Sequence, residues 1–165
     1  MNDDALKSIM TRLALLETRI DRAASADMPY TEFGPWTPTW KGSTGDGSYT
    51  YTNQFGEYGV LGNLVFLTGR ISISAITVAP TGVILIGGLP YASSATNNVS
   101  GVMSAGEWGA LTLTAGYTYV SGNIASSSSV ISVRQSGSGV ASGNIAVAGL
   151  GATAAIIFTA VYSRV

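Results

Sequence analysis

The chain changes character abruptly near residue 30. Residues 1–29 contain no glycine and carry nine of the 17 charged side chains, whereas all 21 glycines and the other eight charges belong to the following 136 residues. Charged residues make up 10% of the chain, against about 25% in ordinary soluble domains. We therefore expect two parts, a charged N-terminal segment (1–28) and a long, nearly uncharged body (29–165).

Composition excludes several classes of function. The chain has no cysteine and no histidine, which removes disulfides, thiol catalysis and the commonest metal ligand and general base. It has no basic patch, so nucleic-acid binding is not expected. The uncharged stretch 135–163 has a dense apolar part of about nine residues, short of the roughly 20 that span a membrane. We expect no membrane insertion, no cofactor and no metal.

The N-terminal segment has the pattern of a coiled coil. Residues 5–24 lack glycine and proline, and their apolar side chains alternate at spacings of three and four, as in a heptad repeat. Asp27 to Pro29 ends the pattern, because proline does not continue a helix. The apolar positions, here called the heptad stripe, are Leu6, Ile9, Leu13, Leu16, Ile20 and Ala23.

Two and a half heptads are marginally stable as one chain, and a three-chain assembly would bury the stripe. The run from Arg12 to Glu17 resembles a short trimerisation motif of parallel three-stranded coiled coils. In this register Arg12 occupies position g and Glu17 position e, so the two can pair between neighbouring chains. The alternative is an amphipathic helix packed on its own body.

The body has the pattern of many short β-strands. Thr, Val, Ile, Tyr and Ser dominate after Tyr30, and glycine and proline mark the turns between the apolar runs. About ten strands at spacings near ten residues predict a mainly β fold, an antiparallel β-sandwich of jelly-roll type. The expected strands are 36–40, 49–55, 63–75, 83–86, 98–104, 107–114, 116–120, 122–125, 130–134, 144–148 and 154–163.

The last expected strand is apolar on both faces. Ile156, Phe158 and Tyr162 share one face, and Ile157 and Val161 share the other. A sandwich strand needs one apolar face, so the second face should meet another layer or a sister subunit. We assign Ile156, Phe158 and Tyr162, together with the heptad stripe, Arg12 and Glu17, to the contacts of a homotrimer.

The body offers little for catalysis and more for binding. Its carboxylates are Glu32, Asp46, Glu57 and Glu107, too sparse to predict an enzyme, and one carboxylate at Asp46 is too few for a calcium site. Four aromatic residues near expected turns are candidates for stacking on a sugar, unless they fill the core or a subunit interface. They are Tyr91, Trp108, Tyr117 and Tyr119.

Four motifs follow one another in the first half of the body. They are Trp36–Trp40, Tyr49–Tyr51, a Gly-Asn strand over 56–71, and Ile84–Tyr91 with its Gly-Leu-Pro-Tyr turn. In this order they resemble the jelly-roll knob of bacteriophage tail-fibre and related virion proteins, over about residues 34–92. The resemblance implies a trimeric knob carried on a fibrous or anchoring N-terminal segment.

The resemblance leads to a functional hypothesis. We expect a homotrimeric virion structural protein, a short tail fibre whose knob binds a bacterial surface polysaccharide while other virion proteins of the baseplate, tail or capsid hold it. One alternative is a capsid decoration trimer that stabilises the head. A more distant one is a polysaccharide-degrading tail enzyme with carboxylates at a subunit interface.

Overall fold

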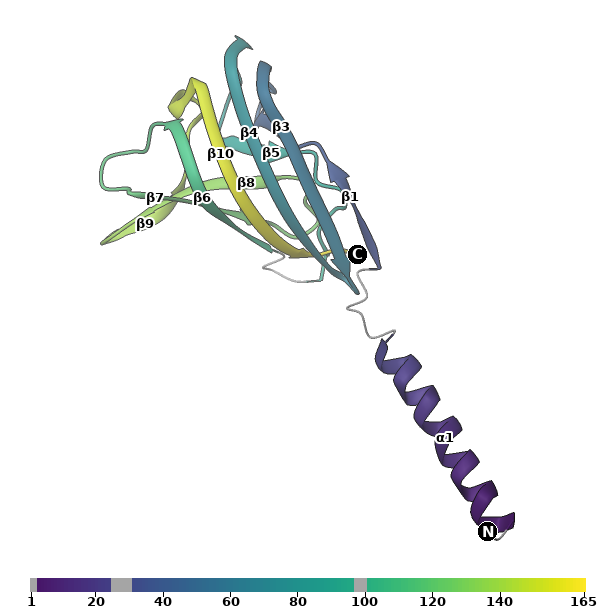
Figure 1. Cartoon of the computed structure of the whole chain (residues 1–165). Coiled ribbons are helices and arrows are strands. Elements are labelled where there is room, and N and C mark those ends of the chain that lie inside the picture. The colour runs from purple at the N-terminus through teal and green to yellow at the C-terminus, as the bar shows by residue number, and fades with distance from the viewer. Residues whose placement is uncertain (1–2, 25–30, 97–100) are drawn as a thin grey trace. The chain divides into compact units, whose positions relative to one another are not determined.

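The computed structural model describes residues 3–24, 31–96 and 101–165, and divides the chain into two units, 1–30 and 31–165. The first unit contains one helix, α1 (Asp3–Ala24), drawn in purple in Figure 1. Its side chains are described from residue 7 to residue 17, and all of these are exposed. The side chains of Leu6, Ile20 and Ala23 lie outside the described residues, and the trimer stays a prediction.

The second unit consists of ten strands in one antiparallel sheet. This confirms the mainly β, antiparallel body expected from the sequence. The strands are β1 (Glu32–Trp36), β2 (Thr39–Gly42), β3 (Ser48–Leu61), β4 (Leu64–Val78), β5 (Ile84–Gly87), β6 (Gly101–Leu111), β7 (Tyr119–Ile124), β8 (Ile131–Gly137), β9 (Val140–Asn144) and β10 (Leu150–Ser163), with a 3-10 turn at Val147–Gly149.

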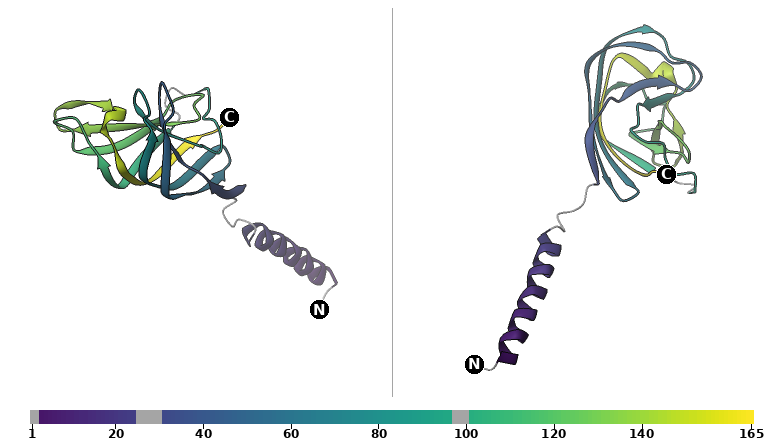
Figure 2. Two further views of the ribbon diagram at one scale, coloured as in Figure 1. Left: turned by 90° about the horizontal axis from the view of Figure 1, so that it is seen from above. Right: turned by 90° about the vertical axis from the view of Figure 1, so that its right-hand side faces the viewer.

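The sheet curls so that its two halves enclose the core. Its order is β1-β3-β4-β10-β6-β7-β8-β5-β2, with β9 paired to β8, and the right-hand view of Figure 2 shows the curl. Hairpins join β3 to β4, and β6 to β9 form a meander. The jelly-roll arrangement is not confirmed, because the strands form one continuous sheet.

The two ends of the sheet are consecutive in the sequence. The expected strand 36–40 is split at Thr37 and Pro38, so that β1 pairs with β3 at one end and β2 pairs with β5 at the other. Proline has no N–H to donate to a ladder, which favours a break there. Both tryptophans of the motif are buried, and the Trp36 Nε1 donates to the Thr68 carbonyl at 2.9 Å.

The core corrects one assignment made from the sequence. Ile156, Phe158 and Tyr162 are 1–2% exposed and belong to the chain's own hydrophobic core. The Phe158 ring meets the Trp36 ring edge-on at 6.1 Å. These three side chains therefore pack within the chain's own core, and they are not available for a subunit contact.

Candidate binding surfaces

The heptad stripe is the first candidate surface. Within the described part of α1, Ile9, Leu13 and Leu16 each leave 54–56% of their side chains exposed. Arg12 and Glu17 are exposed on the same helix. A helix alone cannot bury such a stripe, so these side chains are available to a partner.

A partly exposed apolar row crosses five strands on the outer face of the sheet. The register places Phe33, Gly59, Phe66, Val161 and Val102 side by side, on β1, β3, β4, β10 and β6 in turn. At its two ends Phe33 is 67% exposed and Val102 59% exposed, whereas Phe66 is 36% exposed, Val161 is half-buried and Gly59 is buried. We call this row the outer apolar band. It lies on the face of β10 that carries Ile157 and Val161.

A second row on the same face carries charge. Phe55, Arg70, Ile157 and Glu107 are paired across β3, β4, β10 and β6. A row that contains Glu57, Thr68, Thr159 and Ser104 separates it from the outer apolar band. The register of β6 against β10 shifts between Ile157 and Phe158, and such a bulge re-aims side chains.

A depression of about 70 Å³ lies where this charged row passes the bulge. We call it the Trp108 depression. Its size suits one substituent of a ligand rather than a whole ring. In the described part of the chain, no ion pair joins Arg70 to Glu107, so both groups keep free hydrogen-bonding capacity. The lining residues are Arg70, Ser72, Glu107, Trp108, Gly109, Ala155, Ile156 and Ile157.

Two of the four predicted aromatic residues meet beside this depression. The Trp108 and Tyr119 rings are edge-on at 6.1 Å, and the Tyr119 hydroxyl is 3.4 Å from the Ser104 hydroxyl. Trp108 is half-buried and packs against the hydrophobic core, where it pairs with the buried Ile156, whereas Tyr119 is 43% exposed. Tyr117 lies elsewhere: its hydroxyl donates to the Ala141 carbonyl at 2.8 Å, which links the turn before β7 to β9.

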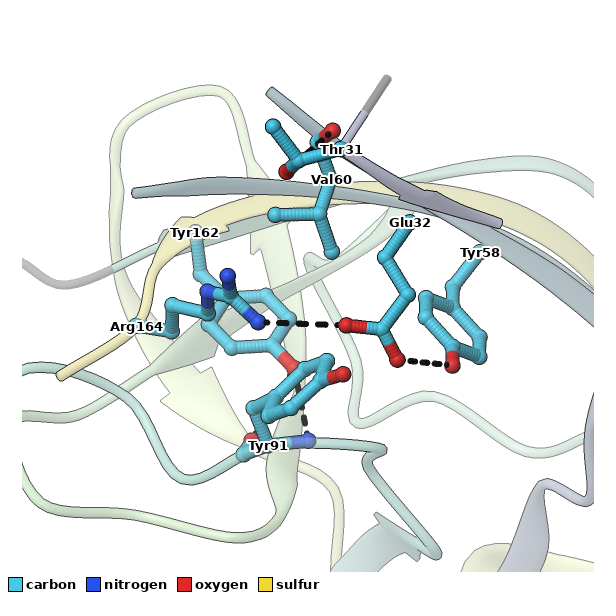
Figure 3. A network of polar contacts seen from close by, with 7 residues as sticks. All are labelled: Thr31, Glu32, Tyr58, Val60, Tyr91, Tyr162 and Arg164. Carbon is cyan, nitrogen blue, oxygen red and sulfur yellow. Dashed lines mark hydrogen bonds and ion pairs between the residues drawn. The ribbon is translucent and has the colours of Figure 1, made fainter. Parts of the chain in front are cut away.

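Tyr91, the fourth predicted aromatic, belongs to the network in Figure 3. The Arg164 guanidinium lies 4.6 Å from the centre of the Tyr91 ring, and the Tyr162 hydroxyl donates to the Tyr91 carbonyl at 2.9 Å. Glu32 accepts a 2.8 Å hydrogen bond from the Tyr58 hydroxyl and lies 3.5 Å from Arg164. The network joins β1, β3, the segment after β5 and the end of β10.

Electrostatics in this network favour the charged form of Glu32. Hydrogen bonds from the Tyr91 and Tyr58 hydroxyls, together with Arg164, hold the pKa of Glu32 below its ordinary value of 4.5. The pKa of Tyr58 is raised, mainly by its hydrogen bond to Glu32. Burial raises the pKa of Tyr162 to about 12. These groups stabilise one another, so we assign the network a structural role and not a role in ligand binding.

Sequence reasoning missed Arg70 and Ser72. Both lie on β4, the strand with the clearest alternation, where Arg70 reads as an ordinary solvent-facing residue. Their proximity to Trp108 depends on β10 lying between β4 and β6. The sequence does contain one signal for Arg70: cationic residues are scarce in the body, and Arg70 is one of only four in residues 30–165.

No helix in the described residues is long and apolar enough to cross a membrane. No protein-family model matches the chain, and no curated protein sequence matches it. Among solved structures, the chain is similar to the crystal structure of the Dettilon tailspike protein, with a TM-score of 0.62 and 19% identity over 80% of this chain. It spans 23% of the tailspike chain. The likeness shows a shared fold.

Proposed function

We propose that the chain is a homotrimeric bacteriophage tail protein, located in the virion, whose body binds a host surface glycan at the Trp108 depression. The observation that carries the binding site is the convergence of Arg70, Glu107 and Trp108 at one depression, with Tyr119 against the indole. An indole stacks on a sugar ring, and a guanidinium binds a carboxylate substituent through paired hydrogen bonds. The fold shared with a tailspike supports the assignment to a phage tail.

The trimer is supported by two apolar surfaces that one chain leaves exposed. The heptad stripe would form a parallel coiled coil, with Arg12 of one chain paired to Glu17 of the next. The outer apolar band would pack against a sister body. Because a polar row separates the band from the Trp108 depression, a trimer contact at the band leaves the glycan site open. Three linked weak sites raise avidity without new contacts.

Two other functions have less support. A capsid decoration trimer would use the same apolar surfaces, and nothing in its task requires a charged depression beside Trp108. A glycan-degrading enzyme needs two carboxylates about 5–10 Å apart. Glu57 and Glu107 are three strand positions apart within one chain, or about 14 Å at the usual strand spacing.

A microarray of purified bacterial surface polysaccharides tests the proposal. We expect the full-length protein to bind a subset that contains acidic sugars. Trp108→Ala and Arg70→Ala should each weaken that binding at least tenfold, since each removes a main contact. Tyr117→Phe is the matched control, because Tyr117 bonds to β9 and lies outside the depression.

If both variants still bind the polysaccharide, the Trp108 depression is not the glycan site, and the site lies elsewhere on the body. Binding to no polysaccharide, combined with protein on the capsid in electron micrographs of labelled particles, would favour the decoration trimer. Release of reducing ends from a bound polysaccharide would instead support the glycan-degrading enzyme.

A further inference from the structure

The Trp108 depression is built on two neighbouring rows of side chains across three strands. β10 lies between β4 and β6. In the first row, Ile157 pairs with Arg70 on β4 and with Glu107 on β6. Because the second row has small side chains only, a hollow is left beside the larger first row. From β4 to β6, its members are Ser72, Ala155 and Gly109.

A one-residue bulge in β6 places Glu107 at this hollow. The register that precedes the bulge would set Glu107 opposite Ile156, which is 1% exposed and belongs to the core. Gly106 is the extra residue, and the shift sets Glu107 opposite the exposed Ile157 instead. A slip of one residue moves a side chain to the other face of a sheet, and bulges are common next to functional sites. The position of this carboxylate is therefore a built feature of the fold.

Arg70 and Glu107 stand on opposite sides of an exposed apolar side chain. Ile157 lies between them and is 39% exposed. The two charged residues are two strands apart, or about 10 Å at the usual strand spacing. Both are exposed, and in the part of the chain that the structure describes neither side chain makes a hydrogen bond or an ion pair. The depression therefore combines a donor on one side, an acceptor on the other, and an apolar floor of Ile157 and Ala155.

These three features discriminate among the substituents that a sugar carries. A carboxylate suits Arg70, and Glu107 would repel it from the depression. A hydroxyl can donate to Glu107 but leaves the apolar floor in contact with water. A protonated amine also suits Glu107, but both the apolar floor and the nearby Arg70 disfavour a further positive charge. An acetamido group satisfies the site, because it has an N–H for the carboxylate and a methyl group for the floor.

We infer that the Trp108 depression binds an N-acetylated acidic sugar, with the acetamido group in the depression. The acetamido N–H donates to the Glu107 carboxylate, the methyl group lies on Ile157, and Arg70 holds the carboxylate of the sugar. Hydrogen bonds to a charged acceptor are stronger than those between neutral groups, so Glu107 contributes much of the selectivity. This assignment rests on the proposed function, and it gives Glu107 a role and the glycan a class of sugar.

Pairs of acidic sugars that differ in one substituent test the acetamido group. The probes are the methyl glycosides of N-acetylneuraminic acid and of N-acetylated glucosaminuronic, galactosaminuronic and mannosaminuronic acids, each compared with the analogue that has a hydroxyl in place of the acetamido group. Binding to the full-length protein is followed, up to tens of millimolar, by the Trp108 indole N–H signal in a nitrogen–proton correlation spectrum.

At least one acetamido sugar should shift the Trp108 signal saturably. It should bind about tenfold more tightly than its hydroxyl analogue, or better, which is the value of a hydrogen bond to a charged group. The Trp36 indole donates to the Thr68 carbonyl within the protein, and its signal should not move.

Glu107→Ala is the decisive variant, because it removes the acceptor and leaves Arg70 in place. It should weaken binding of the acetamido sugar about tenfold or more and remove most of its advantage over the hydroxyl analogue. Glu57→Ala is the matched control. It removes an exposed carboxylate from the same face of the sheet, outside the depression, and should keep the preference.

Three results would overturn the acetamido site: no acetamido sugar moves the Trp108 signal, the hydroxyl analogues bind as tightly, or Glu107→Ala keeps the preference. The proposed function survives these results if Arg70→Ala and Trp108→Ala still weaken polysaccharide binding on the microarray. If no acidic polysaccharide binds there, the proposed function fails, and the acetamido site fails with it.

Discussion

Two carboxylates placed in the heptad stripe should dissociate the trimer. Leu13 and Leu16 are adjacent a and d positions, and each is more than half exposed in the single chain. In a three-stranded coil both side chains would become buried, a gain of about 1 kcal/mol for the exposed half of each. The double variant Leu13→Asp, Leu16→Asp replaces that gain with buried charge.

The magnitude follows from the number of charges that the assembly would bury. An isolated buried carboxylate costs several kcal/mol after relaxation. At about 4 kcal/mol each, the two in one chain amount to about 8 kcal/mol, which equals the free energy of a micromolar contact. A trimer held mainly by the coil should therefore be monomeric at micromolar concentration.

Sedimentation equilibrium distinguishes the outcomes. The unaltered protein should have about three times the 16.9 kDa mass of one chain, and the double variant should approach the mass of one chain. The matched control is Thr11→Asp, Leu15→Asp, which adds the same two charges at positions f and c and should stay trimeric. A trimeric double variant would show that the bodies alone hold the subunits, and a monomeric unaltered protein would refute the trimer.

Three further substitutions test the body. Gly56→Ala places a Cβ against the Trp36 indole and should lower the free energy of unfolding by about 1–3 kcal/mol, measured with urea. Gln135→Leu removes three hydrogen bonds, two to Thr114 and one to the Asn144 carbonyl, and should cost about 2–4 kcal/mol in the same assay. For Glu32, a lowered pKa means that its contribution is complete above pH 4.5 and is lost as the pH falls through the lower folded-state value. Glu32→Gln should therefore have the lower melting temperature at pH 7, with the difference shrinking in acid; a pH-independent difference would contradict the assignment.

Much of the body could be predicted from local sequence pattern. The alternation over 63–75 corresponds to β4 (Leu64–Val78), and the apolar run 83–86 to β5 (Ile84–Gly87). Period-two patterning identifies the two faces of a strand, yet it does not say which face is inward when both are apolar. For this reason the sequence pattern predicts Ile156, Phe158 and Tyr162 at a subunit contact, although they pack in the core.

The candidate sites depend on pairings that local pattern does not contain. Trp108 and Tyr119 meet because β6 and β7 pair in one particular register. Arg70 reaches the same depression across β10, whose residues come more than 80 positions later in the chain. The break at Thr37 and Pro38 sends two consecutive strands, β1 and β2, to opposite ends of the sheet. Each outcome is set by long-range strand order.

This placement of β1 and β2 has a mechanical consequence. Tension applied through the N-terminal segment reaches the body first at β1 and next at β2, the two ends of the strand order. Unfolding that begins at the N-terminal end of the body would remove one margin of the sheet and then the other. Each margin carries a buried tryptophan, Trp36 and then Trp40. Separation of each margin from the body would therefore have to expose a buried indole.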